Sequence, residues 1–284
     1  MDIGFIGLGH LGKAIAGRLI DCEHTLTVWN RSAGKTAGLK ASIAASPAEV
    51  AKEAEIINLC LFDSPAVHTV FTQENGLLST DLQGKIIIDH TTNHFRDVLA
   101  FHELCAQAGA IYLEAPVLGS VVPATQGALT VLISGKKEGF TRAEPVLAQI
   151  GKQLFHLEAP GLATKMKLIN NLALATIMAT LAETIAFGEN VGIDKAMVID
   201  ILNVGGGQSL VLNAKKNKLL TEDFSPHFSN SLIYKDLHCL QDLAYEQQQP
   251  LFTGAVTKEL FARTMAEGME SLDFSSIYKL FKRQ

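Results

Sequence analysis

Apolar and polar positions follow different periods in the two halves of this chain. In the first half, short apolar runs rich in β-branched residues alternate with stretches of helical periodicity, and the runs predict strands. The predicted strands are Ile3–Gly7, Leu26–Asn30, Glu55–Leu61, Lys85–Asp89, Ile111–Glu114, Leu129–Ser134 and Gln153–Leu157. Strands that alternate with helices in this way form βαβ units, so the pattern predicts a mainly parallel, doubly wound α/β sheet. Such a sheet binds its ligand outside the carboxyl ends of its strands.

Capping residues mark several helix starts. Ser46 has the features of an N-cap, because Pro47 follows in the first helical position and Glu49 completes a capping box. Later helix starts are predicted at Asp194, Ser209, Ser231 and Pro250.

The strand signals stop after Pro160. From Leu162 the residues follow a helical period, and the first helix is expected to continue to about Val191. We therefore expect an α/β domain over residues 1–160 and an all-helical domain over residues 161–284, joined by that long helix.

Composition and charge narrow the class of protein. Of the 284 residues, 48% are hydrophobic and 19% are charged, which is typical of a globular protein. The net charge of -5 offers no basic surface for nucleic acid. Cysteines without CxxC spacing predict buried free thiols in a reducing compartment. They are Cys22, Cys60, Cys105 and Cys239.

One apolar stretch, residues 168–191, is long enough to suggest a membrane span. It contains polar residues that are costly in hydrocarbon, so a long buried helix is the better interpretation. These residues are Asn170, Asn171, Glu183 and Glu189. The start of the chain has no basic region of the kind that opens a secretory signal, so we expect a cytoplasmic protein with no membrane partner.

A glycine-rich segment follows the first predicted strand and opens a helix, and it reads Gly7-Leu8-Gly9-His10-Leu11-Gly12. In a dinucleotide-binding turn, Gly7 permits the tight bend, Gly9 lets the backbone approach a pyrophosphate, and Gly12 lets the helix pack close to the strand. The N-terminus of the helix offers unpaired N–H groups to the phosphates. Glycine-rich turns also occur for packing alone. Here the strand before the turn and the helix after it favour a Rossmann domain.

The end of the second predicted strand bears on which dinucleotide binds. An Asp or Glu at this place would hold the ribose hydroxyls of NAD. The sequence instead has Asn30-Arg31-Ser32, where Arg31 can pair with the 2′-phosphate of NADP and Ser32 can donate a hydrogen bond. Arg31 as a solvated surface residue is the alternative. The absence of an acidic group favours NADP (NADPH) over NAD.

Later segments of the chain, together with the glycine-rich opening, resemble the β-hydroxyacid dehydrogenase family over essentially the whole length. The matching segments are Asn30-Arg31-Ser32, Asp89-His90-Thr91-Thr92, Glu114-Ala115-Pro116-Val117-Leu118-Gly119-Ser120, Gly161-Leu162-Ala163-Thr164-Lys165-Met166-Lys167-Leu168-Ile169-Asn170-Asn171 and Lys235-Asp236-Leu237. The resemblance implies a 6-phosphogluconate dehydrogenase-like Rossmann domain, a helical second domain and an oxidoreductase that uses NADP.

The resemblance also implies roles for individual residues. Lys167 corresponds to the general acid/base, and Asn171 to the group that orients it and the substrate oxygen. Contacts with the cofactor are expected from Gly7, Leu8, Gly9, His10, Leu11, Gly12, Asn30, Arg31, Ser32, Leu61, Thr92 and Lys235. Contacts with the substrate are expected from Leu118, Gly119, Ser120 and Lys235.

Two positions depart from the family pattern. Leu118 replaces the serine that contacts the substrate carboxylate, so a polar side-chain contact is lost and the pocket becomes less polar. Gly119 and Ser120 still offer backbone N–H groups, which can bind an anion. Ala163 replaces a glycine ahead of Lys167, which is a small change at the start of the helix.

The residues alone leave alternatives for the catalytic assignment. Lys167 and Asn171 lie four positions apart, so they share one face of a helix. They could instead be a structural pair, or Lys167 could extend to solvent. Lys235 could be a solvated helix residue, and Asp89 and Asp236 could be structural caps.

The expected activity is the NADPH-linked reduction of a small aldehyde or keto acid, reversible to the hydroxyacid, on a small anionic substrate. An imine reductase-like enzyme is an alternative, although such relatives carry Asp or Tyr in place of the catalytic lysine. A non-catalytic dinucleotide-binding module is another alternative.

His90 and His94 lack a third ligand, so no metal is expected. A homodimer or homotetramer is expected, because a small helical domain cannot cover the long helix alone.

Overall fold

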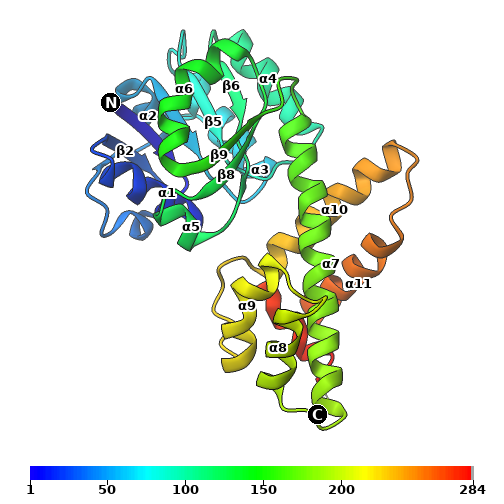
Figure 1. Ribbon diagram of the computed structural model, residues 1–284. Helices are drawn as coiled ribbons and strands as arrows, with labels where there is room; N and C mark the ends of the chain where they lie inside the picture. The colour runs from blue at the N-terminus through cyan, green and yellow to red at the C-terminus, as the bar shows by residue number, and fades with distance from the viewer. Residues whose placement is uncertain (283–284) are drawn as a thin grey trace. The chain divides into compact units, whose positions relative to one another are not determined.

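The structure, a computed structural model, describes residues 1–282 and divides the chain into two compact units. The division falls after Lys167, inside helix α7 (Leu162–Asn190), whereas the sequence suggested a boundary at residue 160. Figure 1 shows a sheet covered by helices in the first unit and helices alone in the second.

The first unit is built on a six-stranded parallel sheet with the strand order β3-β2-β1-β4-β5-β6. The strands are β1 (Asp2–Ile6), β2 (Thr25–Trp29), β3 (Ser42–Ile43), β4 (Ile56–Leu59), β5 (Ile86–Asp89) and β6 (Ile111–Glu114). This is the order of a Rossmann fold, in which the winding direction reverses between β1 and β4. The predicted doubly wound fold is confirmed.

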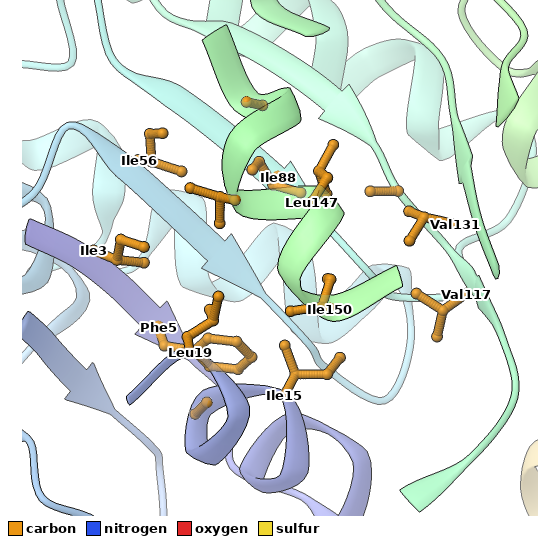
Figure 2. Close-up of a cluster of buried hydrophobic side chains, with 14 of the residues drawn as sticks. Ile3, Phe5, Ile15, Leu19, Ile56, Ile88, Val117, Val131, Leu147 and Ile150 are labelled. Carbon is orange, nitrogen blue, oxygen red and sulfur yellow. The ribbon is translucent and has the colours of Figure 1, made fainter. Parts of the chain in front are cut away.

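Both faces of this sheet are buried, and the strands are therefore apolar at almost every position. Ile3 and Phe5 of β1 point into one core, while Ile6 points into the other. The first core lies under α1 (His10–Asp21), α5 (Val121–Thr125) and α6 (Lys137–Ile150), and Figure 2 shows its side chains. The second core lies under α2 (Pro47–Glu53), α3 (Ser64–Thr72) and α4 (Asp97–Gln107).

A second, three-stranded sheet corrects the expectation drawn from the strand pattern. It contains β7 (Val117–Leu118), β8 (Leu129–Ile133) and β9 (Gly151–His156), with β7 antiparallel to β8 and β8 parallel to β9. The last two predicted strands thus exist but pair with each other rather than extending the main sheet. The two-residue strands β3 and β7 were not predicted, because two residues carry no readable alternation.

The second unit is helical, as predicted. Besides most of α7 it contains α8 (Lys195–Val204), α9 (Leu210–Thr221), α10 (Asn230–Glu246) and α11 (Phe252–Ala266). Short 3₁₀ turns complete the description, and they are 33–36, 77–79 and, in this unit, 274–280. Small residues let the helices approach closely: a Cβ added to Gly188 of α7 would lie 2.6 Å from Val198 of α8.

Most of the predicted helix starts are confirmed. The side chain of Ser46 accepts a hydrogen bond from the Glu49 N–H, and Asp194 and Ser209 cap α8 and α9 in the same manner. Ser231 was wrong by two residues, since Ser229 caps α10. Helix α11 begins at Phe252, shortly after the predicted Pro250.

Helix α7 is long and apolar enough, by length and composition, to cross a membrane, and it alone meets that criterion among residues 1–282. Of its most apolar window, 44% is buried within the protein, and a core helix of a globular protein meets the same criterion.

None of the four cysteines is in a disulfide, and only Cys105 is fully buried. The expectation of burial is wrong for Cys22, Cys60 and Cys239, which are half-buried.

Candidate active site

The glycine-rich turn after β1 has the geometry that a dinucleotide requires. Gly7 has a φ of +97°, and a Cβ added there would lie 2.4 Å from the Cys60 carbonyl oxygen. A Cβ added to Gly12 would lie 2.1 Å from the Gly7 carbonyl oxygen, so only glycine fits between helix and turn. Gly9, the N-cap of α1, is exposed and has no atom within 4 Å of an added Cβ. That open space at a helix N-terminus fits a pyrophosphate group.

Hydrogen bonds of the Asn30 side chain link the end of β2 to this turn. Its Oδ1 accepts a hydrogen bond from the Leu8 N–H at 2.8 Å, and its Nδ2 donates to the Ser32 carbonyl at 3.0 Å. These bonds give Asn30 a positioning role, and its direct contact with the cofactor stays a prediction. Arg31 and Ser32 are exposed beside it. His10 is exposed in the first turn of α1, while Leu11 is half-buried.

The ends of β4 and β5 are joined by a side-chain hydrogen bond of the same kind. The hydroxyl of Thr91 accepts from the Leu61 N–H at 3.0 Å. The carboxylate of Asp89 in turn accepts from the Thr91 N–H at 2.8 Å. Leu61 and Thr92, both predicted to contact the cofactor, therefore follow strands whose ends are fixed to each other, and both are half-buried.

Asp89 lies in a fully buried polar cluster. Besides the Thr91 N–H, it accepts hydrogen bonds from the Tyr112 hydroxyl at 2.6 Å and the Asn93 side chain at 2.8 Å. Burial raises the pKa of Asp89, and these hydrogen bonds oppose the rise because they favour the charged form. Burial and the nearby Asp89 also raise the pKa of the Cys60 thiol to about 12. Asp89 is thus a structural residue of the strand end, one of the alternatives left open by the sequence.

His90 is buried between three segments of the sheet edge. Its Nδ1 lies 2.9 Å from the Ala115 carbonyl oxygen, and its Nε2 lies 3.0 Å from Asn58 Oδ1 on β4. Both partner atoms are acceptors, so a neutral ring can donate to only one of them. Burial lowers the pKa of His90 to about 4, although the hydrogen bond to Ala115 favours the charged form. Within residues 1–282 no three His, Cys, Asp or Glu side chains gather as a metal site would require.

The segment predicted to bind substrate follows β6 and turns at the small sheet. Leu118 is half-buried and pairs with Thr130 of β8. Gly119 has a φ of +117°, a left-handed conformation that favours glycine, and a Cβ there would lie 2.8 Å from Leu129. Ser120 is the half-buried N-cap of α5, and its side chain makes no capping hydrogen bond. The contacts of Leu118, Gly119 and Ser120 with a substrate stay predictions.

Lys167 and Asn171 lie one turn apart on α7, and both are buried, with exposed fractions of 8% and 0%. In the second unit, the Asn171 side-chain amide donates to Asp236 Oδ2 at 2.6 Å. Asp236 Oδ1 pairs with Lys235 Nζ at 2.8 Å. Sequence reasoning missed this link between two motifs. The sequence carried no signal for it, because the need of Asp236 for a partner follows from its burial, which only the structure shows (1% exposed).

The strand order and the glycine turn define a dinucleotide-binding Rossmann protein, and comparison with known families is more specific. Residues 2–158 match the NAD binding domain of 6-phosphogluconate dehydrogenase. Residues 161–281 match the domain described as NAD-binding of NADP-dependent 3-hydroxyisobutyrate dehydrogenase. The chain belongs to the β-hydroxyacid dehydrogenase family and is an NAD(P)-dependent oxidoreductase acting on CH–OH groups.

Individual relatives are similar over the full length of the chain. Glyoxylate/succinic semialdehyde reductase 1 of Arabidopsis thaliana is 30% identical over 99% of both chains. The cytokine-like nuclear factor N-PAC of Mus musculus is 31% identical over 98% of this chain, which spans only 50% of that protein. A solved structure, Psf3 in complex with NADP+ and 2-OPP, superposes with a TM-score of 0.93 at 27% identity, covering 99% of this chain and 100% of that one.

The buried His90 should make the first unit sensitive to acid. Its pKa is lower in the folded protein, about 4, than the ordinary 6.5, so the unfolded chain binds the proton more tightly. The free energy of unfolding should therefore fall as pH drops from about 6.5 to about 4, by about 3 kcal/mol for this group. Urea unfolding at pH 7 and at pH 4.5 should show a smaller drop for His90→Gln than for wild type.

Because the pKa of Asp89 is raised in the folded protein, acid stabilises the fold through Asp89 and destabilises it through His90. Asp89 is present in both proteins, so the difference between wild type and His90→Gln reports on His90. The exposed His68 supplies the control: His68→Gln should retain the wild-type dependence on pH. An equal acid sensitivity of His90→Gln and wild type would contradict the prediction.

Proposed function

We propose that this protein is an NADPH-linked reductase of small aldehydes or keto acids, reversible to the hydroxyacid, in which Lys167 is the general acid/base. The observation that carries the proposal is the buried pair on α7: Lys167 and Asn171 lie one turn apart, and Asp236 holds Asn171 in place. An amine and a side-chain amide one turn apart on one helix face can contact the same substrate oxygen.

When bound, the nicotinamide supplies or accepts a hydride at the substrate carbon. The Lys167 ammonium donates its proton to the carbonyl oxygen as the alcohol forms, and the neutral amine takes a proton back in the reverse direction. Asn171 Nδ2 uses one N–H to bind Asp236, and its second N–H can donate to the substrate oxygen. Asn170 donates to Asn171 Oδ1 at 3.2 Å, which favours this orientation of the amide.

The substrate is proposed to carry an anionic group that Gly119, Ser120 and Thr92 hold. The positive charge of Lys235 lies beside Asp236. Lys235 therefore mainly neutralises that carboxylate and is not an independent site for a substrate anion. Leu118, in place of the family serine, favours a substrate with an apolar group next to its carboxylate. The name of the Arabidopsis relative, a glyoxylate/succinic semialdehyde reductase, supports a small aldehyde acid.

NADPH is the proposed cofactor because the end of β2 offers Arg31 and Ser32, both exposed, and no carboxylate. The similar structure of Psf3 holds NADP+, which supports this choice. The sequence also left open an imine reductase and a non-catalytic binding module. Lys167 argues against the first, and the intact Lys167–Asn171 pair argues against the second. A cytoplasmic location is part of the proposal.

Replacement of Lys167 tests the catalytic assignment. Lys167→Ala should lower kcat at least about a hundredfold, because the proton carrier is lost, while NADPH binding followed by fluorescence should be unchanged. The substrate for this assay comes from a screen of NADPH oxidation with glyoxylate, succinic semialdehyde, methylmalonate semialdehyde, tartronate semialdehyde and a cyclic imine.

Lys165→Ala is the matched control, since this lysine lies two positions away on the same helix and should be dispensable. Retention of most activity in Lys167→Ala would refute the assignment. Reduction of the imine alone would favour the imine reductase, and a wild-type protein that binds NADPH but reduces none of these compounds would favour the binding module.

Replacement of Arg31 tests the choice of dinucleotide. Arg31→Ala should lower kcat/KM for NADPH at least about tenfold, because a charge-assisted contact with the 2′-phosphate is lost, and should leave kcat/KM for NADH unchanged. Steady-state kinetics with both cofactors measure this. The exposed Lys35 provides a control in Lys35→Ala. Equal use of NADH and NADPH by wild type and variant would end the proposal for NADP.

We also propose that the protein self-associates through α7 and α8. Apolar side chains on these two helices are largely exposed: Phe187 66%, Val191 58%, Met197 58%, Ile201 57% and Val204 86%. The three residues of α8 are spaced so that they share one face. The five expose on the order of 500 Å² of apolar surface, which is over half of what each partner contributes to a stable interface (about 800 Å²) and in the upper range of the largest apolar patch on a monomer. A second copy is the proposed occupant, because a two-fold interface is complementary to itself.

A charge on this surface should break the association. Sedimentation of the wild-type protein should give a dimer or tetramer, and Ile201→Glu should shift it to a smaller species because the interface would bury an unpaired carboxylate. Ile43→Lys is the control, since Ile43 is equally exposed on β3 of the first unit. A monomeric wild type, or no effect of Ile201→Glu, would disprove the interface.

A further inference from the structure

Helix α7 begins without a capping residue of its own. Gly161 precedes its first residue and has no side chain to offer to the N–H groups of the first turn, which have no partner within a helix. The partners come instead from the strand ends of the first unit. Glu114 Oε2 accepts from the Thr164 N–H at 3.0 Å, and Glu114 Oε1 accepts from the Gly161 N–H. Ser134 Oγ accepts from the Ala163 N–H at 2.9 Å.

These two capping residues are themselves rigidly held. Glu114 ends β6 and Ser134 follows β8, and their backbones form an isolated antiparallel bridge with N–H to carbonyl distances of 3.0 and 3.1 Å. Glu114 is 1% exposed and Ser134 0%. His102 Nε2 of α4 lies 3.0 Å from Glu114 Oε1, the oxygen that also accepts from the Gly161 N–H. A negative charge at this place also interacts favourably with the positive end of the helix dipole.

The capped turn immediately precedes Lys167. Thr164 and Ala163 lie three and four residues before it, so both lie one turn earlier on the same face of α7. Each residue of a helix rotates about 100° and rises about 1.5 Å, so the anchoring of the first turn fixes both the direction and the height at which the Lys167 side chain leaves the helix.

We propose that Glu114 and Ser134 are positioning residues that set the place of the Lys167 amine through the first turn of α7. This inference rests on the proposed role of Lys167. A cap that served stability alone would change the folded fraction and nothing else. A positioning cap also changes kcat in the folded protein, because proton transfer requires the amine within hydrogen-bonding distance of the substrate oxygen.

Glu114→Gln is the first test, since it keeps the size of the side chain but removes its charge and turns an amide NH₂ toward one of the helix N–H groups. We expect kcat to fall at least about tenfold after correction for the folded fraction measured by thermal unfolding, with the dissociation constant of NADPH near wild type. Glu138→Gln is the matched control, because Glu138 also lies in the first turn of a helix, α6, but is exposed. Its kcat should be unchanged.

Chemical rescue is the second test. Formate added to Glu114→Ala should restore part of kcat, whereas chloride at equal ionic strength should not, because formate offers two oxygens at the spacing of the lost carboxylate, one for each N–H group. His102, in contact with Glu114, also lines a surface cavity of about 300 Å³. Formate should not restore Lys167→Ala, which lacks the amine itself.

If the Glu114 variants do not fold, Ser134→Ala decides the question, because it removes only the acceptor of the Ala163 N–H. The positioning role is overturned if Glu114→Gln and Ser134→Ala keep the wild-type kcat, or if their activity falls only in proportion to the folded fraction. Full activity of Lys167→Ala would overturn the proposed function itself. An inactive Lys167→Ala beside a fully active Glu114→Gln would overturn only this inference.

Discussion

Backbone N–H groups at the carboxyl edge of the parallel sheet are the constraint on which this structure depends. Where each strand ends, the chain turns and leaves donors that the sheet no longer pairs. Side chains at that edge accept from them: Asn30 from Leu8, Thr91 from Leu61, and Glu114 from Thr164. Each bond joins the end of one strand to a segment that the sequence assigns to the cofactor or to catalysis. The edge is therefore a network of side-chain to backbone hydrogen bonds that fixes the loops.

Sequence reasoning succeeded where the cause was local or periodic. Ser46 and Asp194 were recognised as caps because each bonds to an N–H group two or three residues ahead. The parallel strands were recognised because burial on both faces makes them apolar throughout. The glycine-rich turn was recognised because steric demands of the backbone leave few residue types at Gly7 and Gly12.

Sequence reasoning failed where the cause lay far along the chain. The cap of α7 involves Glu114, 50 residues before Thr164, and Ser134, 29 residues before Ala163, and no local pattern joins these positions. The bond from Asn171 to Asp236 spans 65 residues, so Asp236 was left as a candidate cap. The separate small sheet was missed because periodicity predicts that a segment forms a strand but does not predict which strand it pairs with.

Asn30 and Arg31 are neighbours with different contacts, and this difference affects how the cofactor preference can evolve. Asn30 holds the turn through both ends of its amide, whereas the neighbouring Arg31 and Ser32 project outward from the same loop. If Arg31 and Ser32 contact the ribose as we propose, the side chain that holds the turn is not one of those that select the cofactor. Substitutions at 31 and 32 would then change cofactor choice without disturbing the fold, in evolution or by redesign.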